Sequence, residues 1–110
     1  MFNLFTKKEK GYQQIEIAEF DELRKADDHV VLDVRSPEEA KKGTVPGHQL
    51  INYFDGDFKK ELAALDRSKA YLIYCRSGMR SAKACKLMAG MGFARLYNLK
   101  GGIVAWNREQ

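Results

Sequence analysis

Segments with the pattern of β-strands alternate along this chain with segments that have the pattern of α-helices, and this order constrains the fold more than any other feature. Residues 30–34 form an apolar, β-branched run, as expected for a strand that is buried on both faces. An alternating order favours parallel strands with helices packed over both faces of the sheet. We therefore predict an α/β fold, a single domain with a five-stranded, mostly parallel sheet and helices on both faces.

The predicted strands are residues 12–17, 30–34, 49–52, 70–74 and 95–99. The predicted helices are residues 18–25, a short helix after Ser36, and residues 58–65, 79–91 and 102–108. The short helix has the strongest start signal, because Ser36 can cap it, Pro37 fits its first turn and Glu39 completes a capping box. Gly43 is predicted to end it. Residues 1–11 are predicted to be a charged, mobile N-terminal tail, which leaves residues 12–110 as the folded domain.

Length and composition exclude several classes of protein. A chain of 110 residues, 45% of them hydrophobic, has room for one globular domain. No apolar run approaches the length of a membrane span, and the first residues do not have the pattern of a secretory signal. The two cysteines lack the spacing of a disulfide framework, and the two isolated histidines form no metal motif with them. We expect a cytoplasmic protein with no metal, no membrane contact and no cofactor.

The net charge of +4 is modest, and much of the positive charge lies in lysine pairs such as Lys41-Lys42 and Lys59-Lys60. Such pairs are typical of a solvated surface. A patch that binds nucleic acid is the alternative, but no aromatic residues interleave with the lysines as a single-strand binder requires. We therefore expect no nucleic-acid partner.

Cys75 directly follows the predicted strand 70–74, and the predicted helix 79–91 begins a few residues later. In such a strand–loop–helix turn, successive backbone N–H groups point at one spot, and the helix N-terminus adds its positive end. A thiol held there ionises easily, with a pKa of roughly 3.5–7.5. Cys75 is therefore predicted to be a thiolate nucleophile. A buried structural cysteine is the alternative, but it would need neither a glycine in the loop nor flanking arginines.

The loop residues after Cys75 are the candidates for substrate binding: Arg76, Ser77, Gly78, Met79, Arg80 and Ser81. Gly78 would permit a positive φ or a close backbone approach. Ser77 and Ser81 could donate hydroxyl hydrogen bonds, although Ser81 fits a helix-start residue equally well. Positive potential from Arg76 and Arg80 at the mouth of the loop would attract small anions. Cys85 lies on the apolar stripe of the following helix, which favours core packing over a resolving thiol.

The spacing within this loop separates two chemistries. Tyrosine-phosphatase-type loops place an arginine six positions after the cysteine, whereas here the sixth position is Ser81 and Arg80 comes one residue earlier. The shorter loop suits a terminal sulfur atom better than a tetrahedral oxyanion, which disfavours an arsenate or phosphate-ester enzyme. The segment from Cys75 to Arg80 resembles the active-site loop of the rhodanese family of sulfurtransferases.

Three further stretches resemble signatures of that family, in the same order along the chain. They are residues 30–39, in which Asp-Val-Arg precedes a short helix, residues 43–52, and residues 99–106, with Gly-Gly and a tryptophan. The second signature usually reads Gly-His-Ile-Pro-Gly-Ala. Here Thr44 replaces its histidine and His48 replaces its alanine, which leaves partner and substrate preference open.

The resemblance implies a two-step transfer of sulfane sulfur through a Cys75 persulfide. The donor would be thiosulfate or a related persulfide, and the acceptor cyanide or a thiol. Small sulfur-containing anions and thiols are then the expected partners, with a protein sulfur donor or acceptor as a further one. The alternative is a non-enzymatic sulfur carrier or interaction module that receives its persulfide from a protein partner.

Asp33 and Arg35 could serve catalysis, but a structural role is favoured, with Arg35 bonded to Glu39 or Glu38 and Asp33 tying down a loop. Trp106 is interpreted as a core anchor for the last helix.

Overall fold

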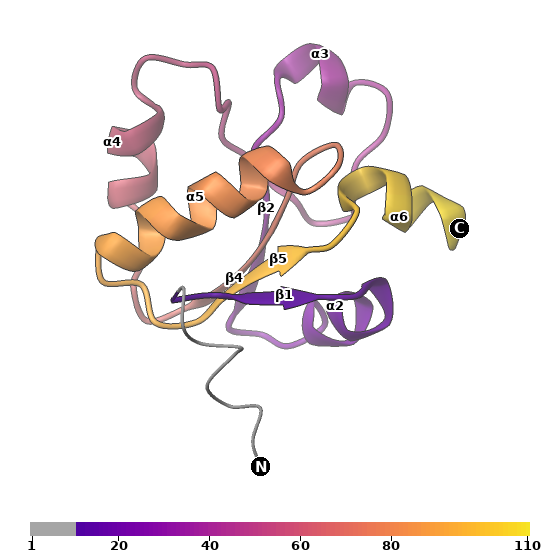
Figure 1. Cartoon of the computed structure of the whole chain (residues 1–110), viewed down its shortest axis with the longest axis horizontal. Helices are drawn as coiled ribbons and strands as arrows, with labels where there is room; N and C mark the ends of the chain where they lie inside the picture. Colours follow the sequence, from indigo (N-terminus) through magenta and orange to yellow (C-terminus); the bar gives the residue numbers. More distant parts are fainter. Residues whose placement is uncertain (1–10) are drawn as a thin grey trace.

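Five strands form one sheet in the order β1-β5-β4-β2-β3, and every neighbouring pair is parallel (Figure 1). The computed structural model describes residues 11–110. The strands are β1 (Gln13–Ile15), β2 (His29–Asp33), β3 (Gln49–Leu50), β4 (Ala70–Tyr74) and β5 (Leu96–Leu99). The helices are α2 (Ile17–Leu23), α3 (Pro37–Ala40), α4 (Phe58–Ala63), α5 (Met79–Gly90) and α6 (Gly102–Arg108). The α/β class and the five-stranded sheet are confirmed, and the sheet is wholly parallel within the described residues.

Alternate side chains of the central strand β4 enter different hydrophobic clusters, as the pleat of a strand requires. Tyr71 and Ile73 pack with side chains of α4 and α5, whereas Leu72 and Tyr74 pack with side chains of α2 and α6. Figure 1 shows α5 and α2 on opposite sides of the strands. The sheet therefore has helices on both faces, and both sides of β4 are buried, which explains its uninterrupted apolar sequence.

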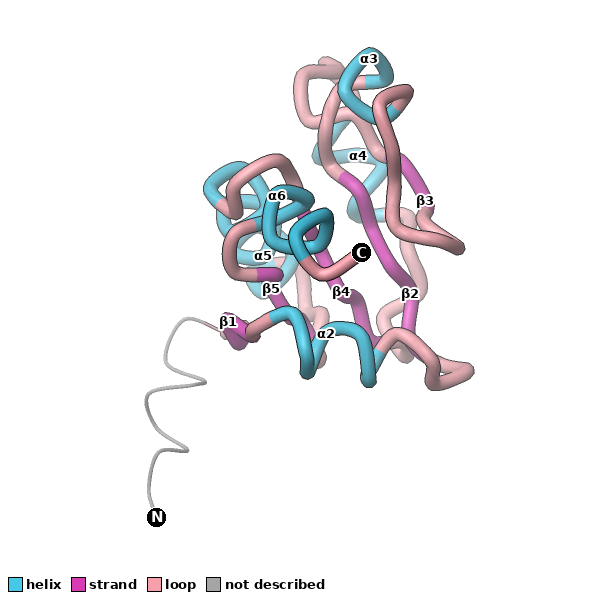
Figure 2. The backbone as a smooth tube through the Cα atoms, turned by 90° about the vertical axis from the view of Figure 1, so that its right-hand side faces the viewer, coloured by secondary structure: helices cyan, strands magenta, loops and turns pink. Residues whose placement is uncertain are grey.

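The segments that follow β2 and β4 leave the sheet at the same edge. Asp33 at the end of β2 lies opposite Tyr74 at the end of β4, so the residues after both strands emerge side by side. Figure 2 shows α3 beyond the end of β2, at the top of the view. In Figure 1 the loop before α5 lies between α3 and α6. In open α/β sheets, ligands bind at this edge.

Several elements are shorter than predicted. The first strand and the third were expected over residues 12–17 and 49–52, but both are edge strands with a single neighbour. The register pairs of β3 with β2 end at Leu50 and Asp33, and one further bond runs from the Ile51 N–H to the Asp33 carbonyl. The capping box of α3 is confirmed, since Ser36 Oγ accepts from the Glu39 N–H and the Glu39 carboxylate accepts from the Ser36 N–H. The prediction that Gly43 ends this helix is wrong, because α3 ends at Ala40.

The predicted tail of residues 1–11 lies outside the described residues except for Gly11. Trp106 is 5% exposed and packs against Phe20 of α2, which confirms its role as a core anchor.

Candidate active site

The thiol of Cys75 lies in a ring of hydrogen-bond donors at the carboxyl end of β4. Its Sγ accepts from the backbone N–H of Gly78 (3.1 Å) and of Ser81 (3.4 Å), and from the Ser81 hydroxyl (3.3 Å). The side chain is 1% exposed. The loop of residues 75–81, called here the Cys75 loop, therefore curls around its own cysteine, as predicted from the strand–loop–helix pattern.

Two glycine positions allow the chain to make this curl. Gly78 has a φ of 105°, in the left-handed region that side chains avoid, and it caps the N-terminus of α5. Gly102 packs directly against the carbonyl oxygens of Cys75 and Arg76, and a Cβ there would collide with both. This close approach lets α6 donate its Ile103 N–H to the Cys75 carbonyl at 2.9 Å. The N-terminus of α6 thus holds the Cys75 loop from outside.

The environment of Cys75 lowers its pKa. Burial disfavours the thiolate, but hydrogen bonds from the Ser81 hydroxyl and from the N–H groups of Ser81, Gly78 and Ser77 outweigh burial. Cys85, on α5, accepts no such hydrogen bond from residues 11–110, and its burial raises its pKa far above the usual value. Cys85 is fully buried in the core, which confirms the prediction of core packing. Of the two cysteines, only Cys75 lies among donors that lower its pKa.

The two arginines of the Cys75 loop have different surroundings. Arg80 forms two hydrogen bonds to the Glu39 carboxylate, of 2.8 and 2.7 Å, and its guanidinium lies 5.2 Å from the centre of the Phe54 ring. Its charge is therefore already paired, contrary to the expectation that it attracts anions at the mouth of the loop. Arg76 is exposed, and no residue in the range 11–110 forms a salt bridge with it. Arg76 is the loop cation still available to an anion.

Similarity to known proteins extends across almost the whole chain. The family model described as Rhodanese-like domain matches residues 16–109. The chain belongs to the rhodanese family.

Individual relatives agree with this family. The Bacillus subtilis protein named "Putative sulfurtransferase YtwF" is 38% identical over 98 residues, which span 88% of this chain and 92% of the relative. An Allochromatium vinosum protein named "Sulfurtransferase" is 34% identical over 88 residues, 79% of each chain. The crystal structure of a rhodanese-related protein from Thermoplasma volcanium matches with a TM-score of 0.78 at 32% identity, and covers 89% of this chain and 93% of that one. The single rhodanese-like α/β fold is therefore established.

Behind the Cys75 loop, this rhodanese domain has a buried ion pair that orders the segment after β2. Arg35 binds the Asp33 carboxylate through Nε and Nη2, and it donates to the Gly43 carbonyl at 2.7 Å. Arg35 was predicted to form a structural ion pair and to bond Glu39 or Glu38. The ion pair is present, but its partner is Asp33, and Arg35 reaches Glu39 only through the Glu39 carbonyl because Arg80 occupies the carboxylate. Asp33 is fully buried, and its carboxylate accepts from Arg35 and from the Tyr74 hydroxyl, which agrees with the expected structural role.

The Tyr74 hydroxyl completes this buried network. It donates to Asp33 at 2.9 Å and accepts from the Val45 N–H at 3.1 Å. Burial raises the pKa of Tyr74 far above the usual value, so the hydroxyl stays protonated and can donate. The network fixes the segment that carries Thr44, which is half-buried, as is His48. Neither side chain is a hydrogen-bond partner of the Cys75 sulfur.

The loop residues predicted to bind substrate differ in their exposure to solvent. Arg76, Ser77 and Met79 are exposed, Gly78 and Arg80 are half-buried, and Ser81 is buried. Ser81 is more than a helix-start residue, because both its N–H and its hydroxyl contact the sulfur. Sequence reasoning missed Asn98, a buried residue of β5 whose amide donates to the Gly78 carbonyl. No local pattern indicated it, because it lies 20 positions from Gly78.

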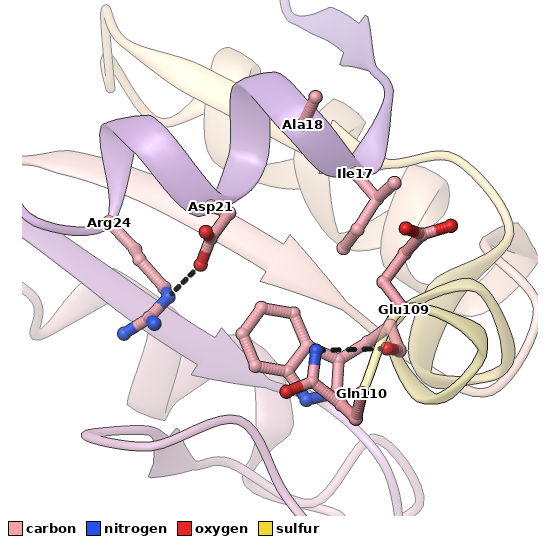
Figure 3. A pocket seen from close by; sticks show the side chains of 7 residues that line it. Ile17, Ala18, Asp21, Arg24, Glu109 and Gln110 are labelled. Carbon is pink, nitrogen blue, oxygen red and sulfur yellow. Dashed lines mark hydrogen bonds and ion pairs between the residues drawn. The ribbon is translucent and has the colours of Figure 1, made fainter.

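A cavity of about 350 Å³ lies away from the Cys75 loop, between α2 and α6 (Figure 3). Arg24 at its edge pairs with Asp21 and lies 5.1 Å from the centre of the Trp106 ring. No residue of the Cys75 loop lines this cavity, so it adds nothing to the sulfur site.

Among residues 11–110, no three His, Cys, Asp or Glu side chains gather in a way that could hold a metal ion. Within the same range, no helix has the length and apolar character needed to cross a bilayer.

Proposed function

We propose that this protein is a sulfurtransferase that carries sulfane sulfur on Cys75, taken from thiosulfate or a related persulfide donor. The observation that carries the proposal is the ring of three donors on Sγ, from Gly78 and Ser81. Donors aimed at one sulfur stabilise the thiolate before reaction, and fixed dipoles of this kind also suit the anionic end of a persulfide. The names of the relatives support the same class of activity.

In the first step, the Cys75 thiolate attacks the outer sulfur of thiosulfate. A bond forms between Sγ and that sulfur, the sulfur–sulfur bond of thiosulfate breaks, and its electron pair leaves with sulfite. In the second step, a thiophilic acceptor such as cyanide attacks the outer sulfur of the persulfide. The bond to Sγ breaks, and its electron pair restores the thiolate. The two steps balance without a cofactor.

The outer sulfur needs donors of its own. The N–H groups of Met79 and Arg80 lie in the first turn of α5, where a helix offers no acceptor. No carbonyl of the Cys75 loop takes them within residues 11–110. We assign these two N–H groups to the terminal sulfur anion, where the positive end of α5 adds to the stabilisation. Because the loop is shorter than a tyrosine-phosphatase-type loop, we expect no hydrolysis of p-nitrophenyl phosphate.

Intact-mass spectrometry tests the proposal. Incubation with thiosulfate should add the mass of one sulfur atom, and later addition of cyanide should remove it. Cys85→Ser should load normally, whereas Cys75→Ser should not load. A sulfur atom found on Cys85 in the Cys75→Ser protein would contradict the assignment, as would a wild-type protein that loads from no sulfane donor.

A second candidate, the sulfur carrier that serves a protein partner, is favoured by one surface feature. Three large hydrophobic side chains within residues 11–110 are exposed: Phe54 (66%), Met79 (73%) and Val104 (36%). All three border the Cys75 loop, since Met79 belongs to it, Phe54 contacts Arg80, and the Val104 N–H donates to the Arg76 carbonyl. We call these three residues the apolar rim. Apolar groups gathered around a reactive group are typical of a protein contact.

The two candidates differ in what the apolar rim does. Changing Val104 and Phe54 to serine should leave thiosulfate:cyanide turnover close to wild type if the physiological donor and acceptor are small. The same double variant should lose persulfide uptake from a cysteine desulfurase if the protein is a carrier. Robust turnover of thiosulfate by the wild type favours the enzyme, and loading only from the desulfurase favours the carrier.

A further inference from the structure

Asn98 is a buried polar residue on β5 that takes no part in the two proposed transfer steps. Its side chain is 1% exposed, and its amide nitrogen donates to the Gly78 carbonyl at 3.1 Å and to Gln14 Oε1 at 2.8 Å. Its own Oδ1 has no hydrogen-bond partner within residues 11–110. Because both neighbours are acceptors, the nitrogen must face them, which leaves the oxygen buried and unpaired.

If stability were the only requirement, an asparagine in this arrangement would be unfavourable. An unpaired buried carbonyl oxygen costs free energy, and an apolar side chain of similar volume would avoid that cost. The useful part of Asn98 is therefore the amide N–H₂ group, which connects β1 through Gln14 to the Cys75 loop through Gly78.

The bond to Gly78 matters because the backbone of a glycine is intrinsically free. A glycine with a φ of 105° can reach many other backbone conformations, and no side chain of its own holds it in place. Within α5, its carbonyl accepts only the first helical bond, from the Ala82 N–H at 3.2 Å. Asn98 adds a second donor to the same oxygen, from the neighbouring strand.

The orientation of this carbonyl decides where the N–H groups point. In a planar trans peptide the C=O and the N–H point in opposite directions, so a Gly78 carbonyl drawn toward Asn98 turns the Met79 N–H away from β5. Fixing Gly78 also fixes its own N–H, which donates to Cys75 Sγ.

We propose that Asn98 is a positioning residue, whose amide holds Gly78 and the Gly78–Met79 peptide group so that their N–H groups face the Cys75 sulfur. Asn98 does not touch the sulfur itself. The assignment of the Met79 N–H to the terminal sulfur rests on the proposed function, whereas the effect on the Cys75 thiolate does not.

The test measures the rate of alkylation of Cys75 by iodoacetamide against pH, in a Cys85→Ser background. Asn98→Leu removes the donor and the unpaired oxygen together at similar volume. Without the hydrogen bond from Asn98 to Gly78, the midpoint of the alkylation profile should move upward by about one pH unit. Below the midpoint, this shift lowers the thiolate fraction of Cys75 about tenfold. Persulfide loading from thiosulfate at neutral pH should slow by a similar factor.

Gln14→Leu is the second variant, because Gln14 is exposed and its loss cannot empty the core. This variant keeps the bond from Asn98 to Gly78 but removes Gln14 Oε1, the other acceptor of the Asn98 amide. The midpoint of its alkylation profile should therefore also move upward, but by less than in Asn98→Leu. A folded Asn98→Leu protein with the wild-type profile would overturn the role of Asn98. If Asn98→Leu does not fold, a wild-type profile in Gln14→Leu would overturn it.

These readouts separate the two proposals. A shifted alkylation profile in a protein that never forms a persulfide would support the positioning role of Asn98 and overturn the proposed function. Normal persulfide loading together with an unshifted alkylation profile in Asn98→Leu would support the proposed function and overturn the positioning role of Asn98.

Discussion

Arg80 of α5 and Glu39 of α3 are joined by two hydrogen bonds, of 2.8 and 2.7 Å, between a guanidinium and a carboxylate. The pair connects the Cys75 loop to the helix after β2, across 41 positions of sequence. Glu39 also accepts from the Ser36 N–H, so the same carboxylate caps α3 and holds the loop arginine. Arg80 is therefore placed to brace the Cys75 loop, whereas Arg76 is placed to meet anions.

This difference predicts opposite salt dependence for the two arginines. Arg80→Ala should reduce thiosulfate use by a similar factor at every ionic strength, because it releases the brace. Arg76→Ala should weaken thiosulfate use at low salt, and the loss should shrink as screening grows. Measuring kcat/KM at several salt concentrations decides the point. A loss in Arg80→Ala that disappears at high salt would mean that Arg80 attracts anions after all.

The same pair predicts how stability depends on pH. The hydrogen bonds from Arg80, opposed by partial burial, lower the pKa of Glu39 from 4.5 to about 2. A carboxylate with a lowered pKa stabilises the fold above its unfolded-state pKa, and that contribution is lost as pH falls from 4.5 toward 2. Urea unfolding should show wild type more stable than Glu39→Gln at pH 7, with the difference much smaller near pH 2. An equal difference at both pH values would assign the effect to packing.

The Ser81 hydroxyl should be a main determinant of the reactivity of Cys75. Among the hydrogen bonds that lower the Cys75 pKa, it makes the largest contribution. Ser81→Ala should raise that pKa, so that alkylation by iodoacetamide at pH 7 slows several-fold while the profile keeps its shape. Ser77→Ala is the matched control, because it removes an exposed hydroxyl and keeps the backbone N–H. Equal slowing in both variants would contradict a specific role for the Ser81 hydroxyl.

Gly102 should tolerate no side chain. A Cβ at this position would collide with the carbonyl oxygens of Cys75 and Arg76, and its φ of 57° is unfavourable for other residues. Gly102→Ala should lower the free energy of unfolding by about 2 kcal/mol or more, or displace α6 from the Cys75 loop. Gly56→Ala is the control, because nothing lies within 4 Å of a Cβ there. Thermal unfolding compares the two, and similar melting temperatures would contradict the close approach of α6.

The amino-acid sequence by itself determined the features that depend on neighbours in the chain. The alternation of apolar strand patterns and helices predicted the parallel sheet, and Ser36, Pro37 and Glu39 predicted the capped start of α3 because a capping box spans a single turn. The position of Cys75 between β4 and α5 predicted its ring of N–H donors for the same reason, since those donors come from the next six residues.

Only the tertiary structure decided which distant side chains meet. The strand order β1-β5-β4-β2-β3 places α3 beside α5. The Glu39 carboxylate therefore pairs with Arg80, whereas Arg35 pairs with Asp33. It also places Asn98 beside Gly78. A charged or amide side chain has several suitable partners in the sequence, and local pattern cannot rank them. The packing of the helices on the sheet selects the partner, because it sets which groups come within hydrogen-bond distance.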